Sequence, residues 1–205
     1  RIRAICKRIK TWKEAPIVLI VSNPVDVLTQ AAFQELGGHG KVLGSGTSLD
    51  TARLKALLGN RFSFDPHSIH GYILGEHGDS EFPAWSTVTA GGVNIRDWPG
   101  YDAQELEGIF QQVRTAAYEI IKRKRATYFA IGAATAMIAE AILRDQRSIL
   151  PVSVPLNGQY GITGISLSLP CVLGRGGVAA VLEPRLTPEE KNSLVRSAET
   201  IRRAL

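Results

Sequence analysis

The first clear pattern in this chain is a continuous apolar run that leads directly into a helical pattern. Residues 17–21 read Ile-Val-Leu-Ile-Val, which is typical of a parallel strand buried on both faces. We expect Asn23 to cap the helix that follows and Pro24 to begin it. The helix should end at Leu36, before two glycines, and a short strand at 41–43 should follow it.

The rest of the chain alternates short strand patterns with longer helical ones. Asp102 opens a capping-box pattern, and apolar residues from Leu106 to Ile120 recur at helical spacing, so one face of that helix should lie in the core. This order of elements predicts the α/β class. In chain order we expect the end of a helix at 1–12, a helix at 48–58, a strand at 69–74, a hairpin or bent strand at 85–95, helices at 102–120 and 127–143, antiparallel strands near 150–154, 164–169 and 178–182, and a last helix from 187.

Composition is that of an ordinary globular protein. The chain has 205 residues, of which 44% are hydrophobic and 21% charged, so it can bury a sizeable core and is too apolar for a disordered chain. The net charge of +5 is modest and scattered, apart from basic stretches at 1–13 and 122–125. Short basic runs occur in many proteins that bind no nucleic acid, and we expect no nucleic-acid partner.

Cysteine usage and apolar segment length bear on the compartment. Cys6 and Cys171 are far apart and give neither a disulfide framework nor a zinc spacing, as is typical of a reducing compartment. The basic N-terminal segment lacks the apolar core of a signal peptide or anchor. The longest weakly charged stretch, 126–139, is shorter than the roughly 20 residues that a membrane span needs. We expect a cytoplasmic protein without a membrane partner.

Residues 75–80, Gly-Glu-His-Gly-Asp-Ser, place one histidine between small and acidic neighbours, in a tight loop after a predicted strand. An unperturbed imidazole titrates close to neutral pH, so His77 is the first candidate for proton transfer. Taken alone, the motif has a plainer interpretation, in which His77 only closes the loop.

A second polar cluster lies upstream, where Asp50 and Arg53 fall three residues apart on one face of a predicted helix. The commoner fate of such a pair is a simple salt bridge. Beside His77, however, the carboxylate could fix the imidazole tautomer, and the guanidinium could bind a small carboxylic acid through two parallel hydrogen bonds. Asn23 follows the first strand at its carboxyl end, where ligands of open α/β sheets bind.

These three stretches, in this order and spacing, resemble the L-lactate dehydrogenase branch of the lactate/malate dehydrogenase family, from about Ile17 to the C-terminus. The resemblance implies NAD as cofactor, L-lactate and pyruvate as substrates, and a homotetramer. His77 would be the acid–base residue, supported by Asp50, and Arg53 would bind the substrate carboxylate. The other residues that the resemblance assigns are Asn23 and Thr127 for the substrate, and Val21, Ser22, Asn23, Ser45 and Ile131 for the cofactor.

Arg125, Lys55 and His70 stand at positions where the family has further characteristic residues. Many family members have glycine after the lysine in Lys-Gly-[Ala/Tyr]-Thr, whereas this chain has Arg125, which bears on the backbone that leads to Thr127. Lys55 and His70 match positions that bind a sugar bisphosphate in many bacterial members, with lysine in place of the usual arginine. The resemblance therefore implies fructose 1,6-bisphosphate as an activator. A solvated lysine and an ordinary strand histidine are the plainer alternative.

The resemblance also implies a division of the chain. Residues 1–43 would be the C-terminal remnant of a Rossmann-type dinucleotide-binding domain, and residues 44–205 the α+β catalytic domain of the lactate/malate dehydrogenase C-terminal type. No Gly-x-Gly-x-x-Gly follows a strand in this sequence. We expect a fragment, a truncated form or one part of a split protein. Catalysis by this chain without a further part is then in question.

Other functions stay open at this stage. The chain could belong to a relative that acts on malate or another 2-hydroxy acid, or it could be a catalytically inactive assembly fragment. A metal site would have to draw on residues that show no ligand spacing, and we expect none. Its candidates would be His39, His67, His70, His77, Glu76 and Asp79.

Overall fold

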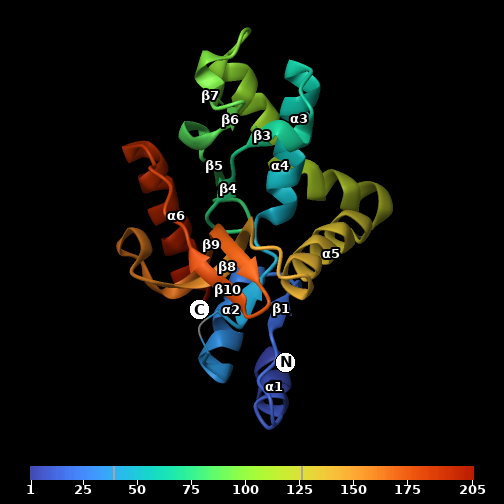
Figure 1. The fold of residues 1–205 in the computed structure, drawn as a ribbon, viewed down its shortest axis with the longest axis vertical. Helices are drawn as coiled ribbons and strands as arrows, with labels where there is room; N and C mark the ends of the chain where they lie inside the picture. The colour runs from blue at the N-terminus through green and yellow to red at the C-terminus, as the bar shows by residue number, and fades with distance from the viewer. Residues whose placement is uncertain (39, 126) are drawn as a thin grey trace.

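The structure is a computed structural model that describes residues 1–38, 40–125 and 127–205, so His39 and Ala126 lie outside it. Its centre is a mixed five-stranded sheet in the order β1-β2-β8-β9-β10 (Figure 1). β1 and β2 are parallel, and β2 and β8 are antiparallel. The pairs β8–β9 and β9–β10 are antiparallel, as predicted. The strands are β1 (Val18–Ile20), β2 (Val42–Gly44), β8 (Ser148–Asn157), β9 (Thr163–Gly174) and β10 (Gly177–Val181).

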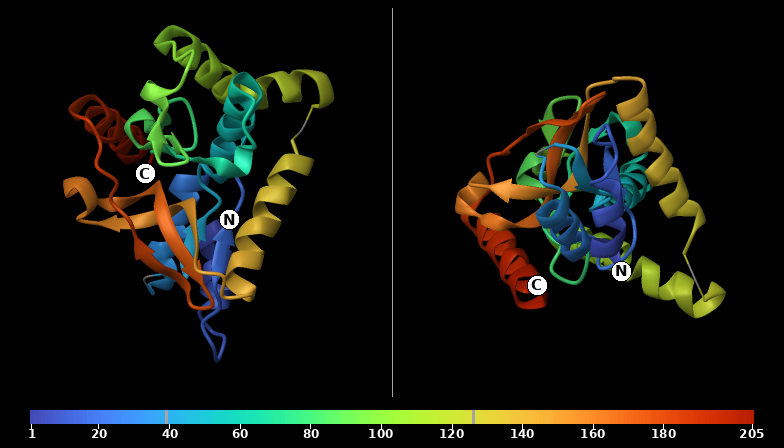
Figure 2. Two further views of the ribbon diagram at one scale, coloured as in Figure 1. Left: turned by 45° about the horizontal axis from the view of Figure 1, so that its top comes forward. Right: turned by 90° about the horizontal axis from the view of Figure 1, so that it is seen from below.

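Helices cover this sheet and extend beyond it. The second helix, α2, packs against β8 and β9, while α5 and α6 contact β9 and lie on either side of the sheet in both views (Figures 1 and 2). The α-helices are α1 (Ile2–Ile9), α2 (Val25–Leu36), α3 (Ser48–Phe62), α4 (Ala103–Lys124), α5 (Phe129–Leu143) and α6 (Pro188–Ala204).

Short strands form two smaller sheets beside α3 and α4. A three-stranded sheet has the order β3-β6-β7, and β4 pairs with β5. The hairpin predicted at 85–95 is confirmed, because β6 and β7 are antiparallel neighbours. These strands and the 3-10 helices are η1 (Pro66–Ser68), β3 (Ile69–His70), β4 (Ile73–Leu74), β5 (Phe82–Pro83), η2 (Trp85–Thr87), β6 (Thr89–Ala90), β7 (Val93–Asn94), η3 (Ile95–Asp97) and η4 (Gln159–Gly161).

Two expectations are wrong in detail. The single strand predicted at 69–74 is two strands, β3 and β4, which join different sheets. Gly71 separates them with a φ of 151°, and a Cβ at this glycine would lie 2.7 Å from Val88, so the chain turns where no side chain fits. Asn23 does not cap α2: Pro24 itself occupies the N-cap in an extended conformation, and the helix begins at Val25.

Three clusters of buried apolar side chains hold these layers together. The largest joins the sheet to α5 and α6, the second lies between α3, α4 and the small sheets, and the third lies under α1 and α2. Cys6 and Cys171 are buried and free in two of them. Among the described helices, none has the length and apolar character to cross a bilayer.

The predicted boundary between residues 43 and 44 falls inside β2. This strand pairs with β1 on one side and meets β8 on the other, where Gly44 is opposite Ser153. A Cβ at Gly44 would lie within 3.0 Å of three side chains, including that of Thr29 on α2, so glycine permits the close approach. The division into two domains stays a prediction.

Candidate active site

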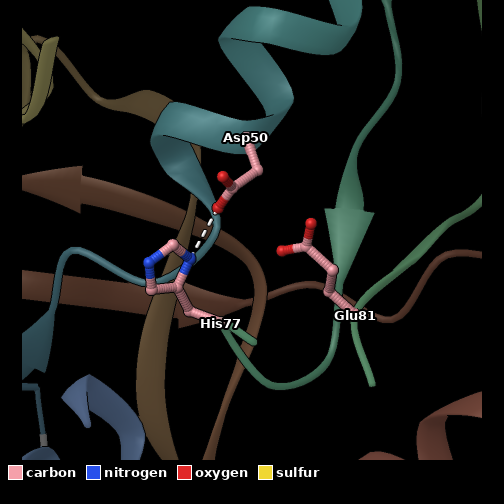
Figure 3. Close-up of side chains that lie close together, drawn as sticks. All are labelled: Asp50, His77 and Glu81. Atoms are coloured by element: carbon pink, nitrogen blue, oxygen red, sulfur yellow. Dashed lines mark hydrogen bonds and ion pairs between the residues drawn. The ribbon is translucent and has the colours of Figure 1, made fainter. Parts of the chain in front are cut away.

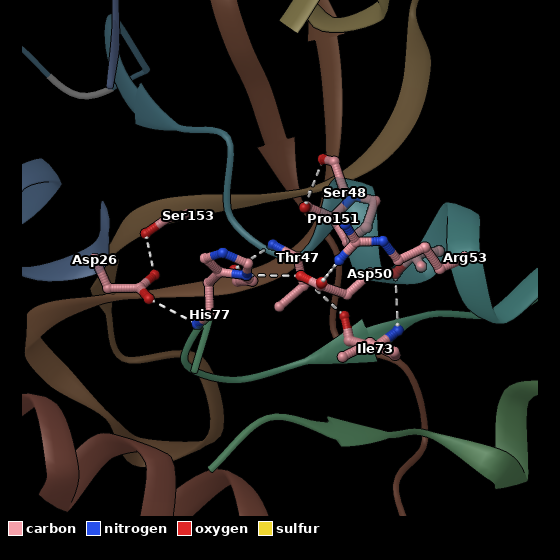
Figure 4. A network of polar contacts seen from close by, with 11 residues as sticks. Asp26, Thr47, Ser48, Asp50, Arg53, Ile73, His77, Pro151 and Ser153 are labelled. Atoms are coloured by element: carbon pink, nitrogen blue, oxygen red, sulfur yellow. Dashed lines mark hydrogen bonds and ion pairs between the residues drawn. The ribbon is translucent and has the colours of Figure 1, made fainter. Parts of the chain in front are cut away.

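The backbone of the histidine loop is fixed to the central sheet and to α2. Gly75 leaves β4 with a φ of 93° and exchanges two backbone hydrogen bonds with Ser168 of β9. The N–H of His77 donates to Oδ2 of Asp26 at 2.8 Å, and the hydroxyl of Ser153 donates to Oδ1 of the same carboxylate at 2.5 Å (Figure 4). His77 is therefore held at a defined place by groups far away in the sequence.

The first turn of α3 is attached to the same framework. The Thr47 hydroxyl donates to the carbonyl of Ile73 at 2.6 Å, and the Ile73 N–H donates to the Thr51 hydroxyl at 2.9 Å. The Ser48 hydroxyl donates to the carbonyl of Pro151 at 2.9 Å (Figure 4). Small hydroxyl residues at the start of this helix thus tie it to β4 and β8, and the polar face of α3 meets the histidine loop.

Asp50 joins the two elements. Nδ1 of His77 lies 2.6 Å from Oδ2 of Asp50 (Figure 3). A guanidinium nitrogen of Arg53 lies 3.4 Å from Oδ1 of the same carboxylate (Figure 4). Asp50 is 3% exposed, whereas the imidazole of His77 keeps 25% of its surface accessible. Nε2 of His77 has no hydrogen-bond partner among the described residues. Asp50 can therefore orient the imidazole while Nε2 stays available for a ligand.

The electrostatics of this arrangement act on His77. Burial by itself lowers the pKa of the imidazole, but the hydrogen bond and the charge of Asp50, with a contribution from the charge of Asp26, outweigh burial, so the pKa is raised. The nearby Arg53 opposes part of that increase. Burial raises the pKa of Asp26 to about 6, although the bonds from Ser153 and His77 act in the opposite direction. The imidazole can thus carry a proton near neutral pH.

One cavity of about 220 Å³ opens beside these groups. It is lined by Asn23, Asp50, Arg53 and His77, so four of the residues singled out in the sequence meet in one place. Asn23 is exposed, and its side chain makes no hydrogen bond within the described chain. A proton-transfer group, a cation and an unengaged amide therefore border the same space, which suits a small oxygen-rich anion.

The other predicted ligand residues do not line this cavity. Thr127 is exposed and lines a neighbouring cavity of about 530 Å³, to which Arg53 also contributes. Val21, Ser22, Ser45 and Ile131 line neither cavity; Ser45 is buried and donates its N–H to the carbonyl of Ile20 at 2.8 Å. Their roles stay predictions.

Lys55 and His70 lie outside both cavities. The Lys55 ammonium is 5.9 Å from the centre of the Tyr72 ring, and burial lowers the pKa of this lysine. His70 is exposed on β3. A lysine that is partly buried over an aromatic ring is not an ordinary solvated surface group.

Sequence analysis missed several residues that border the 220 Å³ cavity. The charged groups not singled out before are Glu81 and Arg114, and Tyr118 lies beside them. Asp79, which was considered only as a metal candidate, also lines the cavity. Tyr118 donates to Asp79 at 3.3 Å, which connects α4 to the histidine loop. The closeness of Glu81 to His77 in the sequence was an available signal. The sequence around Arg114 gave no such signal, because the packing of α4 on α3 brings this residue to the cavity.

Metal binding was considered for the cluster of Asp50, His77 and Glu81, whose donor atoms lie within 4.8 Å of one another (Figure 3). The guanidinium of Arg53 already contacts Asp50, and a cation so close opposes binding of a metal ion. Among the earlier candidates, His67 is highly exposed and pairs with Asp65, and His39 lies outside the described residues. We interpret the cluster as an acid–base group.

Comparison with known proteins decides the family. The sequence model of the lactate/malate dehydrogenase alpha/beta C-terminal domain matches residues 47–205. The chain belongs to the lactate/malate dehydrogenase family. The family resemblance and the predicted fold class are thereby confirmed.

Individual relatives within the lactate/malate dehydrogenase family are similar over most of this chain. L-lactate dehydrogenase 1 of Lactobacillus acidophilus is 45% identical over 193 residues, which cover 92% of this chain and 60% of that protein. L-lactate dehydrogenase of Thermoanaerobacter pseudethanolicus is 48% identical, with coverage of 97% and 65%. The crystal structure of the minor L-lactate dehydrogenase from Enterococcus mundtii superposes with a TM-score of 0.94 at 40% identity and covers 98% of this chain and 66% of that one. The chain thus spans about 60% to 66% of these relatives.

Proposed function

We propose that this protein is an NAD-dependent L-lactate dehydrogenase that interconverts L-lactate and pyruvate. One observation carries the proposal: the His77–Asp50 pair, Arg53 and Asn23 border a single cavity. The relatives described above are named L-lactate dehydrogenases, which supports the same substrate pair.

His77 supplies the proton in the direction of keto-acid reduction. The imidazolium donates from Nε2 to the ketone oxygen, which becomes the hydroxyl of lactate, and the ring is left neutral. Asp50 accepts from Nδ1, so it keeps the proton on the opposite nitrogen poised toward the cavity and stabilises the charged ring. In lactate oxidation the neutral ring takes the hydroxyl proton back.

Arg53 and Asn23 orient the substrate. The guanidinium can bind the substrate carboxylate through two parallel hydrogen bonds, which fixes both position and orientation. The Asn23 amide can donate to the substrate oxygen that receives the proton. Thr127, near Arg53 in the neighbouring cavity, offers a neutral polar group to a small substrate side chain.

The residues at the carboxyl end of β1 suit a nicotinamide cofactor. The unengaged Asn23 amide at this edge, next to His77, is a polar group that a ligand can satisfy. Val21, Ser22, Asn23, Ser45 and Ile131 would hold the nicotinamide end. NAD supplies hydride transfer when it is bound.

The test is NADH oxidation by the complete protein with pyruvate, oxaloacetate or a branched 2-keto acid. We expect pyruvate to give a kcat/KM at least about tenfold above the other two. His77→Ala should lower turnover by about 100-fold or more while NADH fluorescence titration still reports binding. A preference for oxaloacetate would favour the malate branch, and no oxidation with any keto acid would overturn the proposal.

Fructose 1,6-bisphosphate is the proposed activator, bound at Lys55 and His70. The exposed His70 and the partly buried cation of Lys55 support a site for a phosphate group. The pyruvate saturation curve should shift to lower concentrations in its presence, and Lys55→Met should abolish the shift. Superimposable curves for the unmodified protein would remove this part of the proposal.

Assembly into a homotetramer in the cytoplasm completes the proposal. Large apolar side chains on α4 and α5 are exposed, including Ile121, Phe129 and Leu143, and burying them against other chains would remove that exposure. Light scattering of the complete protein gives the molecular mass. The free, buried cysteines suit a reducing compartment.

A further inference from the structure

A buried acid that the proposed reaction leaves without a role lies beside the His77–Asp50 pair. Glu81 precedes β5 and is 5% exposed, and its backbone N–H donates to the carbonyl of Gly78 at 3.2 Å. Its carboxyl group faces Asp50 and the imidazole (Figure 3). One donor atom from each of the three side chains lies within 4.8 Å of the others.

The cations near Glu81 are engaged with other groups. Arg53 pairs with Asp50 at 3.4 Å. Arg114 donates to the Gln111 side chain at 2.8 Å and to the backbone carbonyl of Asp79 at 3.3 Å. Within the part of the chain that the structure describes, neither guanidinium makes an ion pair with Glu81. A buried carboxylate in this position would lack a direct counter-ion.

Two effects therefore favour the uncharged form of Glu81. Burial raises the pKa of its carboxyl group, and the negative charge of Asp50 raises it further, while Arg53 and Arg114 only partly offset these effects. Glu81 borders the 220 Å³ cavity and, on the side of α6, another cavity of about 540 Å³. The charged and titratable groups that line these two cavities with Glu81 are Asp50 and Arg53 on α3, His77 and Asp79 in the loop, Glu107, Arg114 and Tyr118 on α4, and Glu189, Glu190 and Arg196 on α6.

We propose that Glu81 is a positioning residue that stays protonated near neutral pH and donates a hydrogen bond to Asp50. This bond restrains the carboxylate that orients His77. It also keeps a second negative charge out of a site that must accept the substrate carboxylate at Arg53. The assignment rests on the proposed function, because that function makes His77 and Asp50 the acid–base pair.

Substitutions separate an uncharged donor from an ionised carboxylate. We expect Glu81→Ala to lower kcat for pyruvate reduction about tenfold with a smaller effect on KM. Glu81→Gln should recover most of that loss, since its amide N–H can donate to Asp50 without a charge. Glu199→Gln, which removes an exposed carboxylate of α6 that lines neither of these cavities, is the control. If Glu81→Gln is as impaired as Glu81→Ala, the proposal fails.

Spectroscopy tests the protonation state without any turnover. In the complete protein labelled with 13C at glutamate carboxyls, we expect one resonance to keep the shift of a protonated acid at pH 7.5, and Glu81→Gln should remove it. Titration of every glutamate below pH 6 would overturn the proposal even if lactate dehydrogenase activity is present. Conversely, Glu81 could be protonated in a protein that does not reduce pyruvate. The protonation state proposed for Glu81 would then be right and the proposed function wrong. If Glu81→Gln fails to fold, Glu81→Asp should still shift the retained resonance out of the glutamate spectrum and so assign it.

Discussion

Nδ1 of His77 lies 2.6 Å from Oδ2 of Asp50, although one residue comes from a loop after β4 and the other from the first turn of α3. The contact depends on two sets of backbone anchors, at Asp26 for the loop and at Ile73 for the helix. Because Asp50 raises the pKa of His77 against the effect of burial, this one distance controls how much of the imidazole is charged at neutral pH.

Asp50→Asn should therefore lower the pKa of His77. Only the smaller effect of the Asp26 charge then opposes burial, so the imidazole loses its proton at a lower pH and fewer molecules can donate it to a ketone. We expect kcat/KM for pyruvate reduction at pH 7.5 to fall about 100-fold and its alkaline limb to move toward acid. Rates measured from pH 5.5 to 9 check this.

Asp65→Asn is the matched control, because Asp65 contacts Nδ1 of His67 at 2.9 Å on the exposed surface. Removing that carboxylate alters an aspartate–histidine pair of the same kind that does not line the cavity, and the pH profile should not move. Equal profiles for Asp50→Asn and the unmodified protein would contradict the role given to Asp50.

Arg53→Lys should weaken pyruvate binding. Lysine keeps the charge but cannot form two parallel hydrogen bonds to a carboxylate, and the loss of one such bond to a charged group is worth about 1.5–3 kcal/mol. We expect KM for pyruvate to rise about 10- to 100-fold, with NADH binding retained.

The matched control for that change is Arg144→Lys, because Arg144 makes an exposed i,i+4 pair with Glu140 at 3.0 Å. Exposed pairs of this kind contribute little, so its kinetics should equal those of the unmodified protein. An unchanged KM in Arg53→Lys would assign the substrate carboxylate to another cation, and Arg114 in the same cavity would be the next to test.

Local sequence patterns were sufficient for most elements of the fold. The continuous apolar run at 17–21 contains β1, and Thr187 with Glu190 forms the capping box of α6. Patterns failed where packing decides the outcome. Gly71 separates β3 from β4, and its close approach to Val88, distant in the sequence, leaves no room for a side chain. The sequence of residues 69–74 alone does not predict the contact between Gly71 and Val88.

Some residues of the candidate site were likewise predictable from local sequence patterns, and others depend on packing. Asp50, Arg53 and His77 were predicted to converge, because a helix spacing and a loop motif point to complementary chemistry, and the structure places them around one cavity. Asp26 was not predicted to take part. In the sequence it is an acid in the first turn of a helix, where acids are common. Its burial and its contact with Ser153 of β8 depend on how α2 packs against the sheet.

Asp26→Asn should change how stability depends on pH. Because burial raises the pKa of Asp26 from its ordinary 3.8 to about 6, the folded state holds this proton more tightly than the unfolded state. The stability that this carboxyl contributes is greatest below pH 4 and declines as pH rises through 6. Between pH 5 and 7.5, we expect the free energy of unfolding of the unmodified protein to fall relative to Asp26→Asn by on the order of 1 kcal/mol.

Urea unfolding at both pH values measures this difference. Asp26→Ala provides the contrast, because it leaves the His77 N–H and the Ser153 hydroxyl without their acceptor and should destabilise at both pH values by about 1–3 kcal/mol. A difference between Asp26→Asn and the unmodified protein that is independent of pH would show that Asp26 has an ordinary pKa.

Arg125 occupies a backbone position that favours glycine. It is the C-cap of α4 with a φ of 64°, and its N–H donates to the carbonyl of Ile121 at 2.7 Å. The family commonly has glycine at this place, and the left-handed conformation is kept here by a residue with a Cβ. We expect Arg125→Gly to raise the free energy of unfolding by about 1 kcal/mol, since glycine adopts this conformation without the steric cost. Arg123→Gly, inside the same helix, should lower it by about 1 kcal/mol. Urea unfolding compares Arg125→Gly with Arg123→Gly. A similar loss of stability in both variants would mean that the Arg125 side chain stabilises the fold by more than its left-handed backbone conformation costs.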